Sequence, residues 1–174
     1  MNETVVLRFR DLVTEPGGTI REHLRILQEQ GTVWWGWWMR QSEEPPRELF
    51  GRLLDAINGG VEPAAWLFDT GQELLHRCRI ADLRVSPSGE NMGPPALDRA
   101  PAYYQRGTYP AWFLLSDISP EPLDSAPVGW AYADFPSNPE RPEHKELRGQ
   151  PVASLDELRN TDATMWLVSE QSAP

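Results

Sequence analysis

The sequence has few of the residues on which several classes of protein depend. Cys78 is the only cysteine among 174 residues, which excludes a disulfide framework and a cysteine-based zinc site. No apolar run approaches the roughly 18–20 residues that span a bilayer, and the N-terminus lacks a signal-peptide pattern. We therefore expect a protein without membrane contact in a reducing, cytoplasmic setting.

Positive charge is scarce as well. The formal net charge is −10, and Lys145 is the single lysine among 16 basic residues. Acidic groups repel the phosphate backbone, so broad electrostatic binding to duplex nucleic acid is not favoured. A small ligand, a flipped base or a local arginine pocket stays compatible with this charge.

Motifs for catalysis and for metal binding are missing. The three histidines have no metal-pair spacing, and the sequence contains no H-E-x-x-H, G-x-S-x-G, P-loop or Gly-rich dinucleotide motif. Strand alternation puts Cys78 on one face with His76 and turns Arg77 and Arg79 to the other, which favours a buried structural thiol. The sequence predicts no enzyme, no metal and no cofactor.

Apolar periodicity predicts the element order β-α-β-α-β-β-β-β-α-β. Thr19 is expected to cap the first helix, with Glu22 completing a capping box, and Ser154 to cap the last. Segments 87–102 and 136–150, rich in proline and polar residues, are expected to be loops. Strands are predicted at 4–10, 32–40, 64–70, 73–86, 111–118, 128–135 and 163–170, and helices at 19–31, 46–57 and 154–160.

The number of consecutive strands argues against a doubly wound parallel sheet. A small, strongly bent mixed β-barrel with two or three flanking helices, of class α+β, fits the order better. The length is that of one domain, which we place at residues 1–170, followed by a tail at 171–174.

The run TVWWGWWMR holds four of the eight tryptophans. Alternation along a strand assigns Trp35 and Trp37 to the core and puts Trp34, Gly36 and Trp38 on the opposite face. Strand neighbours two apart are roughly 6.5–7 Å apart, so two indoles flanking a glycine could hold a planar ring. Alternatively, the glycine admits a neighbouring side chain of the protein itself.

Two further groups are candidates for ligand contact. Arg8 and Arg10 share a strand face, where they either grip a phosphate or carboxylate or form an ordinary ion-paired surface. Tyr103, Tyr104 and Tyr109 cluster in the loop PAYYQRGTYPAWF, which leads to Trp112. These aromatic residues either close over a ligand or fix a long loop to the barrel.

The strings VVLRFRDL, TIREHLRILQEQGTVWWGWW and PAYY…YPAWFLLSDI together resemble a small PUA-like domain. Such domains occur at the N-terminus of certain bacterial calcineurin-like phosphoesterases and in other defence-linked proteins. PUA-like folds, which include the PUA, ASCH, EVE and YTH groups, hold a nucleotide or modified base in an aromatic pocket. The resemblance implies a ligand sensor that uses Trp34 and Trp38, with a separate effector protein or domain supplying the chemistry.

Two hypotheses from different classes follow. The first is a non-enzymatic sensor of a modified base or nucleotide in bacterial antiviral defence. The second is a protein-interaction module whose tryptophans form the core and whose acidic C-terminal half docks a basic partner. A third, hydrolysis as in some ASCH-type proteins, needs a lysine or a paired base beside a carboxylate, and Lys145, the only lysine, lies in an acidic loop. Burial of the indoles discriminates between the first two.

Overall fold

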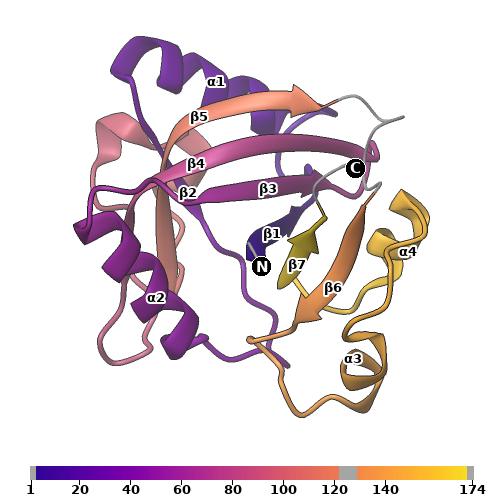
Figure 1. The fold of residues 1–174 in the computed structure, drawn as a ribbon. Coiled ribbons are helices and arrows are strands. Elements are labelled where there is room, and N and C mark those ends of the chain that lie inside the picture. The colour runs from indigo at the N-terminus through magenta and orange to yellow at the C-terminus, as the bar shows by residue number, and fades with distance from the viewer. Residues whose placement is uncertain (1–2, 122–128, 172–174) are drawn as a thin grey trace.

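A computed structural model describes residues 3–121 and 129–171, and these residues form an α+β fold around one sheet (Figure 1). The strand order is β2-β5-β4-β3-β1-β7-β6, and neighbouring strands are antiparallel except for β1 and β3. The strands are β1 (Glu3–Phe9), β2 (Val33–Gly36), β3 (Ala64–Asp69), β4 (Leu74–Val85), β5 (Ala111–Glu121), β6 (Trp130–Asp134) and β7 (Met165–Glu170). The helices are α1 (Gly18–Gln30), α2 (Arg47–Asn58), α3 (Pro142–Leu147) and α4 (Leu155–Asn160), with short 3-10 turns at Leu97–Arg99 and Ala102–Tyr104.

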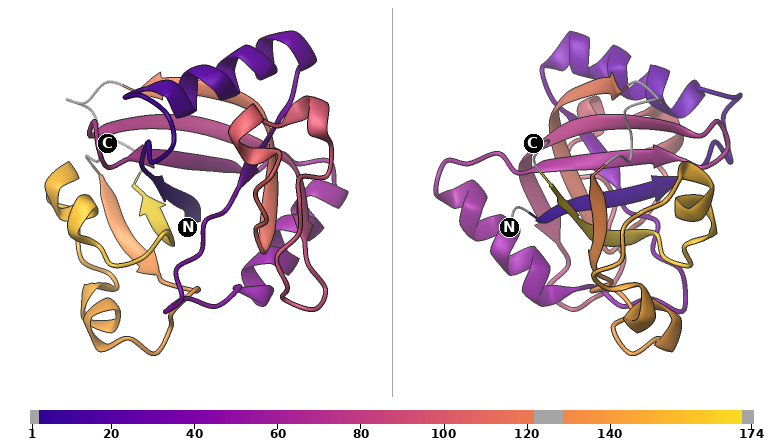
Figure 2. Two further views of the ribbon diagram at one scale, coloured as in Figure 1. Left: turned by 180° about the vertical axis from the view of Figure 1, so that it is seen from behind. Right: turned by 45° about the vertical axis from the view of Figure 1, so that its right-hand side comes forward.

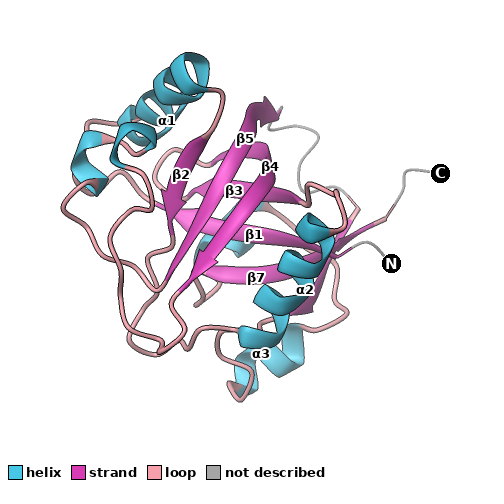
Figure 3. Ribbon diagram, turned by 90° about the vertical axis from the view of Figure 1, so that its left-hand side faces the viewer, coloured by secondary structure: helices cyan, strands magenta, loops and turns pink. Residues whose placement is uncertain are grey.

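The sheet curls but does not close into the predicted barrel. Strands β2 and β6 form its two edges, and β2, β5 and β4 cross over β1 and β7 in Figure 3. The chain leaves the sheet after Gly36 and bridges the open side. The amide of Trp37 still donates to the carbonyl of Ala111 in β5 at 3.0 Å, and farther along the loop the amide of Glu44 donates to the carbonyl of Ser137, after β6, at 2.7 Å. A loop therefore spans the gap where a closed barrel would have paired strands.

The helices exceed the two or three that were predicted. Helix α3 forms within segment 136–150, which was expected to be loop. Helix α4 begins as predicted, because the hydroxyl of Ser154 accepts a hydrogen bond from the amide of Glu157 at 3.2 Å. Across the part of the chain that the structure describes, no helix combines the length and the apolar character needed to cross a membrane.

The start of α1 corrects the predicted Thr19 cap. The helix begins at Gly18, after Gly17 in the left-handed conformation, and Thr19 is buried. The carboxylate of Asp11 accepts hydrogen bonds from the amides of Gly17 at 2.9 Å and Thr19 at 3.1 Å. Partial burial opposes the effect, but these hydrogen bonds lower the pKa of Asp11. A carboxylate from the preceding loop thus replaces the local capping box.

Buried core clusters pack on both faces of the sheet. Trp35 and Trp37 belong to the largest core cluster, with residues of α1 and α2, as strand alternation predicts. Trp66 and Trp130 belong to a second cluster, which includes residues of α4. Helices α3 and α4 lie beside β6 in both views of Figure 2. Cys78 is buried as predicted, and burial raises the pKa of its thiol to about 12.

Candidate functional site: an aromatic cavity beside an arginine cluster

Six of the eight predicted site residues line one cavity of about 140 Å³. The cavity lies where the ends of β1 and β2, the start of α1 and the loop before β5 meet. Its volume is close to the roughly 150 Å³ at which an apolar protein cavity holds a benzene ring. We call it the aromatic cavity. The six residues are Arg8, Arg10, Gly36, Trp38, Tyr103 and Tyr104.

Aromatic rings in edge and tilted contacts form the walls of this cavity. The ring centroids of Tyr103 and Tyr104 are 4.6 Å apart, and those of Tyr104 and Tyr109 are 5.4 Å apart at 77°. On the other side, Phe9 meets Trp35 at 5.0 Å and 81°. Such contacts fix the orientations of the rings. Burial raises the pKa of all three tyrosines, so their phenols stay protonated.

The predicted slot between Trp34 and Trp38 is wrong in its geometry. A Cβ atom on Gly36 would lie 2.6 Å from Cδ2 of Tyr109, so the tyrosine ring fills the space that the glycine leaves. Trp34 is buried against Trp112, and neither lines the cavity. The strand ends at Gly36, so alternation stops there and Trp38 turns outward, 63% exposed. The structure thus has the alternative arrangement, in which the glycine admits a neighbouring side chain.

Three arginines adjoin the aromatic cavity. Arg8, Arg10 and Arg40 line a hollow of about 190 Å³, the arginine hollow, which shares Arg8, Arg10 and Trp38 with the cavity. Burial lowers the pKa of Arg8, and repulsion from Arg40 and Arg10 lowers it further. No acidic side chain lines either space among the described residues. Positive charge is therefore concentrated here in a chain whose net charge is −10.

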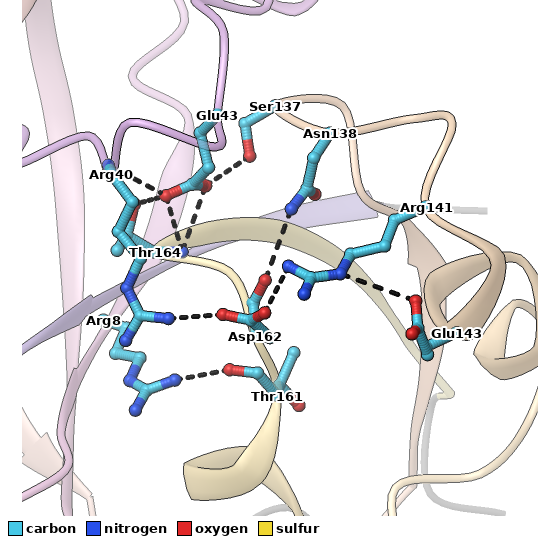
Figure 4. Close-up of polar contacts among 10 residues, drawn as sticks. All are labelled: Arg8, Arg40, Glu43, Ser137, Asn138, Arg141, Glu143, Thr161, Asp162 and Thr164. Carbon is cyan, nitrogen blue, oxygen red and sulfur yellow. Dashed lines mark hydrogen bonds and ion pairs between the residues drawn. The ribbon is translucent and has the colours of Figure 1, made fainter.

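Two of these arginines are held by the segment before β7, as Figure 4 shows. Arg8 donates to the carbonyl of Thr161. Arg40 pairs with Asp162, which also pairs with Arg141. Arg10 is exposed, and it forms no ion pair within residues 3–121 and 129–171. The cluster thus combines two anchored guanidiniums with one that is available to an anion.

A buried carboxylate fixes the loop that carries Trp38 and Arg40. Glu43 is 3% exposed and accepts hydrogen bonds from the hydroxyls of Ser137 and Thr164 and from the amides of Thr164 and Arg40 (Figure 4). The indole of Trp37 donates to the same Thr164 hydroxyl at 3.0 Å. A buried charge with this many donors is well satisfied. Sequence reasoning missed this residue because its partners are far away along the chain.

His23 lies behind the aromatic wall and is fully buried. Its ring centroid is 4.5 Å from that of Trp35 and 5.5 Å from that of Tyr104. Its Nδ1 is 2.8 Å from the carbonyl oxygen of Thr19, a backbone acceptor that assigns the proton to this nitrogen. Burial lowers the pKa of His23 to about 4, so the ring is neutral near pH 7. His23 thus packs against two aromatic residues that line the cavity.

Among the described residues, no group of three or more histidine, cysteine, aspartate or glutamate side chains is placed to hold a metal ion. In a comparison with protein families, residues 5–173 match the family described as Pua-like. No curated protein and no solved structure matches the chain.

Proposed function

The chain belongs to the PUA-like family, and on that premise we propose that it is a non-enzymatic domain that binds a modified base or a nucleotide in the aromatic cavity. Domains of this kind bind RNA or nucleotides in general. The setting in antiviral defence and the separate effector are part of the proposal, and they rest on the resemblance of the sequence alone.

The observation that carries the proposal is the pairing of the aromatic cavity with the arginine hollow. Stacking a base on an aromatic side chain contributes about 1–3 kcal/mol. A guanidinium offers a phosphate two parallel hydrogen bonds as well as charge. Because arginines line both spaces and no carboxylate does among the described residues, a cationic ligand is disfavoured and a neutral ring carrying an anionic group is favoured.

Individual side chains take distinct roles in this proposal. The ligand ring lies among Trp38, Tyr104 and Tyr109, so Tyr109 takes the place that the sequence assigned to Trp34. The phosphate meets Arg8 and Arg10 at the mouth. A volume of about 140 Å³ suits one six-membered ring, so we expect pyrimidines to bind more tightly than purines.

Isothermal titration calorimetry with 5′-mononucleotides, including base-methylated forms, tests the proposal. Trp38→Ala should weaken binding by about 1–3 kcal/mol, or roughly 5- to 150-fold. Arg10→Gln should weaken it by about 1.5–3 kcal/mol, because a hydrogen bond to a charged group is lost. Arg79, in β4, is exposed like Arg10 but lines neither space, so Arg79→Gln is the matched control.

The outcomes separate the proposal from its competitor. If no nucleotide of the panel binds the wild-type protein, the proposal fails. Equal losses in Arg10→Gln and Arg79→Gln would also contradict it, because the effect would then be one of overall charge. The interaction-module hypothesis draws support from the burial of Trp34, Trp35 and Trp37, but it offers no reason for the arginine cluster.

A further inference from the structure

The exposed indole of Trp38 is not explained by one cavity alone. Trp38 lines three spaces: the aromatic cavity, the arginine hollow and a third hollow of about 420 Å³. An indole that is 63% exposed contributes little to the core of the protein. Because it lines all three spaces, both faces of its indole ring are placed to contact a ligand.

The third hollow offers hydrogen-bonding groups. Gln41, Asn91 and Thr108 line it, together with Trp38 and Tyr109. The three polar side chains are exposed and take part in no side-chain hydrogen bond within the described ranges 3–121 and 129–171. Amide and hydroxyl groups beside an exposed aromatic ring are the combination that reads the edge of a stacked base.

The arginine hollow adjoins both other spaces. It shares Arg8 and Arg10 with the aromatic cavity and Arg40 with the third hollow. No acidic side chain lines the third hollow in the described part of the chain. An anion on the arginines would therefore adjoin two sites for aromatic rings, as a phosphate adjoins two bases in a nucleic acid strand.

We propose that the site takes two adjacent nucleotides of a single strand, with Trp38 between their bases. This inference rests on the proposed function and names its ligand. One base enters the aromatic cavity, the linking phosphate lies on Arg8, Arg10 and Arg40, and the second base stacks on Trp38 in the third hollow. Asn91 and Thr108 contact the edge of the second base. The short arginine patch suits two nucleotides, whereas the acidic chain disfavours a long duplex.

The test compares each mononucleotide of the panel, pX, with the dinucleotides pXpT and pTpX. A further probe carries an abasic sugar in place of thymidine. One dinucleotide order should bind at least about fivefold more tightly than pX, and the abasic probe should lose that gain. The double variant Asn91→Ala/Thr108→Val should also reduce the gain while leaving the affinity for pX unchanged.

Each outcome has a definite meaning. Equal affinities for pX and both dinucleotides overturn the inference and leave the proposed function in place. An abasic probe that binds as tightly as the full dinucleotide also overturns it, because the gain then comes from the phosphate alone. If neither the mononucleotides nor the dinucleotides bind, the proposed function fails, and the inference fails with it.

Discussion

Gly36→Ala tests whether Tyr109 fills the gap in the tryptophan run. The new methyl carbon would lie 2.6 Å from Cδ2 and 2.9 Å from Cε2 of Tyr109, whereas carbon atoms pack at about 3.5–4.0 Å. The ring cannot withdraw freely. Its centroid is 5.2 Å from that of Trp112 and 5.4 Å from that of Tyr104, and its backbone pairs with Met92.

The magnitude follows from two opposing effects. Overpacking of this kind destabilises a protein by about 1–3 kcal/mol. The backbone of Gly36 lies outside the left-handed region, so alanine suits it and, without the clash, stabilises the fold by about 0.4–1 kcal/mol. Gly36→Ala should therefore lower the free energy of unfolding in the wild-type protein and raise it in a Tyr109→Ala background.

Urea denaturation followed by circular dichroism measures all four proteins of this double-mutant cycle. A coupling free energy of about 1–3 kcal/mol between the two positions, equal to the overpacking cost, is expected. If Gly36→Ala is neutral in the wild-type protein, Tyr109 does not occupy the gap. If it destabilises both backgrounds equally, the clash involves another group, and the reasoning is refuted.

Three further predictions concern buried groups. The pKa of His23 is about 4 in the folded protein and 6.5 in the unfolded chain, so the unfolded state binds more protons at low pH. The free energy of unfolding should therefore fall by about 3 kcal/mol as the pH drops from 6.5 to 4. In a His23→Gln variant, urea denaturation across this pH range should show a smaller fall. Glu43→Ala leaves buried hydroxyl and amide donors without an acceptor and should lower the free energy of unfolding by about 3 kcal/mol. Glu44→Ala, at the exposed neighbouring residue, should change it by less than about 0.5 kcal/mol. Similar losses in both variants would contradict the role of Glu43 in fixing the loop. The buried thiol of Cys78 should resist Ellman's reagent in the native protein and react after denaturation. Rapid labelling of the native protein would contradict the burial of this thiol.

The local periodicity of apolar residues predicted most of the helices and strands. Alternation assigned Trp35 and Trp37 to the core correctly, and the hairpin of β3 and β4 follows from two strand patterns around a Gly71 turn. Sheet closure could not be predicted in this way. Whether β2 meets β6 depends on where the chain leaves the sheet, and the bond from the Glu44 amide to Ser137 joins residues far apart in sequence.

The candidate site was predictable in its residue types more than in its geometry. The sequence marked Arg8, Arg10 and Trp38, which the structure brings to one cavity. It could not show that the strand ends at Gly36, because that follows from the ring of Tyr109 and from the loop that Glu43 holds in place. Contacts of this kind join distant segments and leave no periodic signal in the chain.

The binding of a ligand ring in the aromatic cavity is tested most directly by ¹H–¹⁵N NMR of the tryptophan indoles. The chain has eight tryptophans, and each contributes one indole N–H signal. On titration with the tightest-binding nucleotide, the signals of Trp38 and Trp35 should shift, because both residues line the cavity. Those of Trp66 and Trp130, in the second core cluster, should stay in place. Shifts at Trp66 and Trp130 with none at Trp38 would contradict the account.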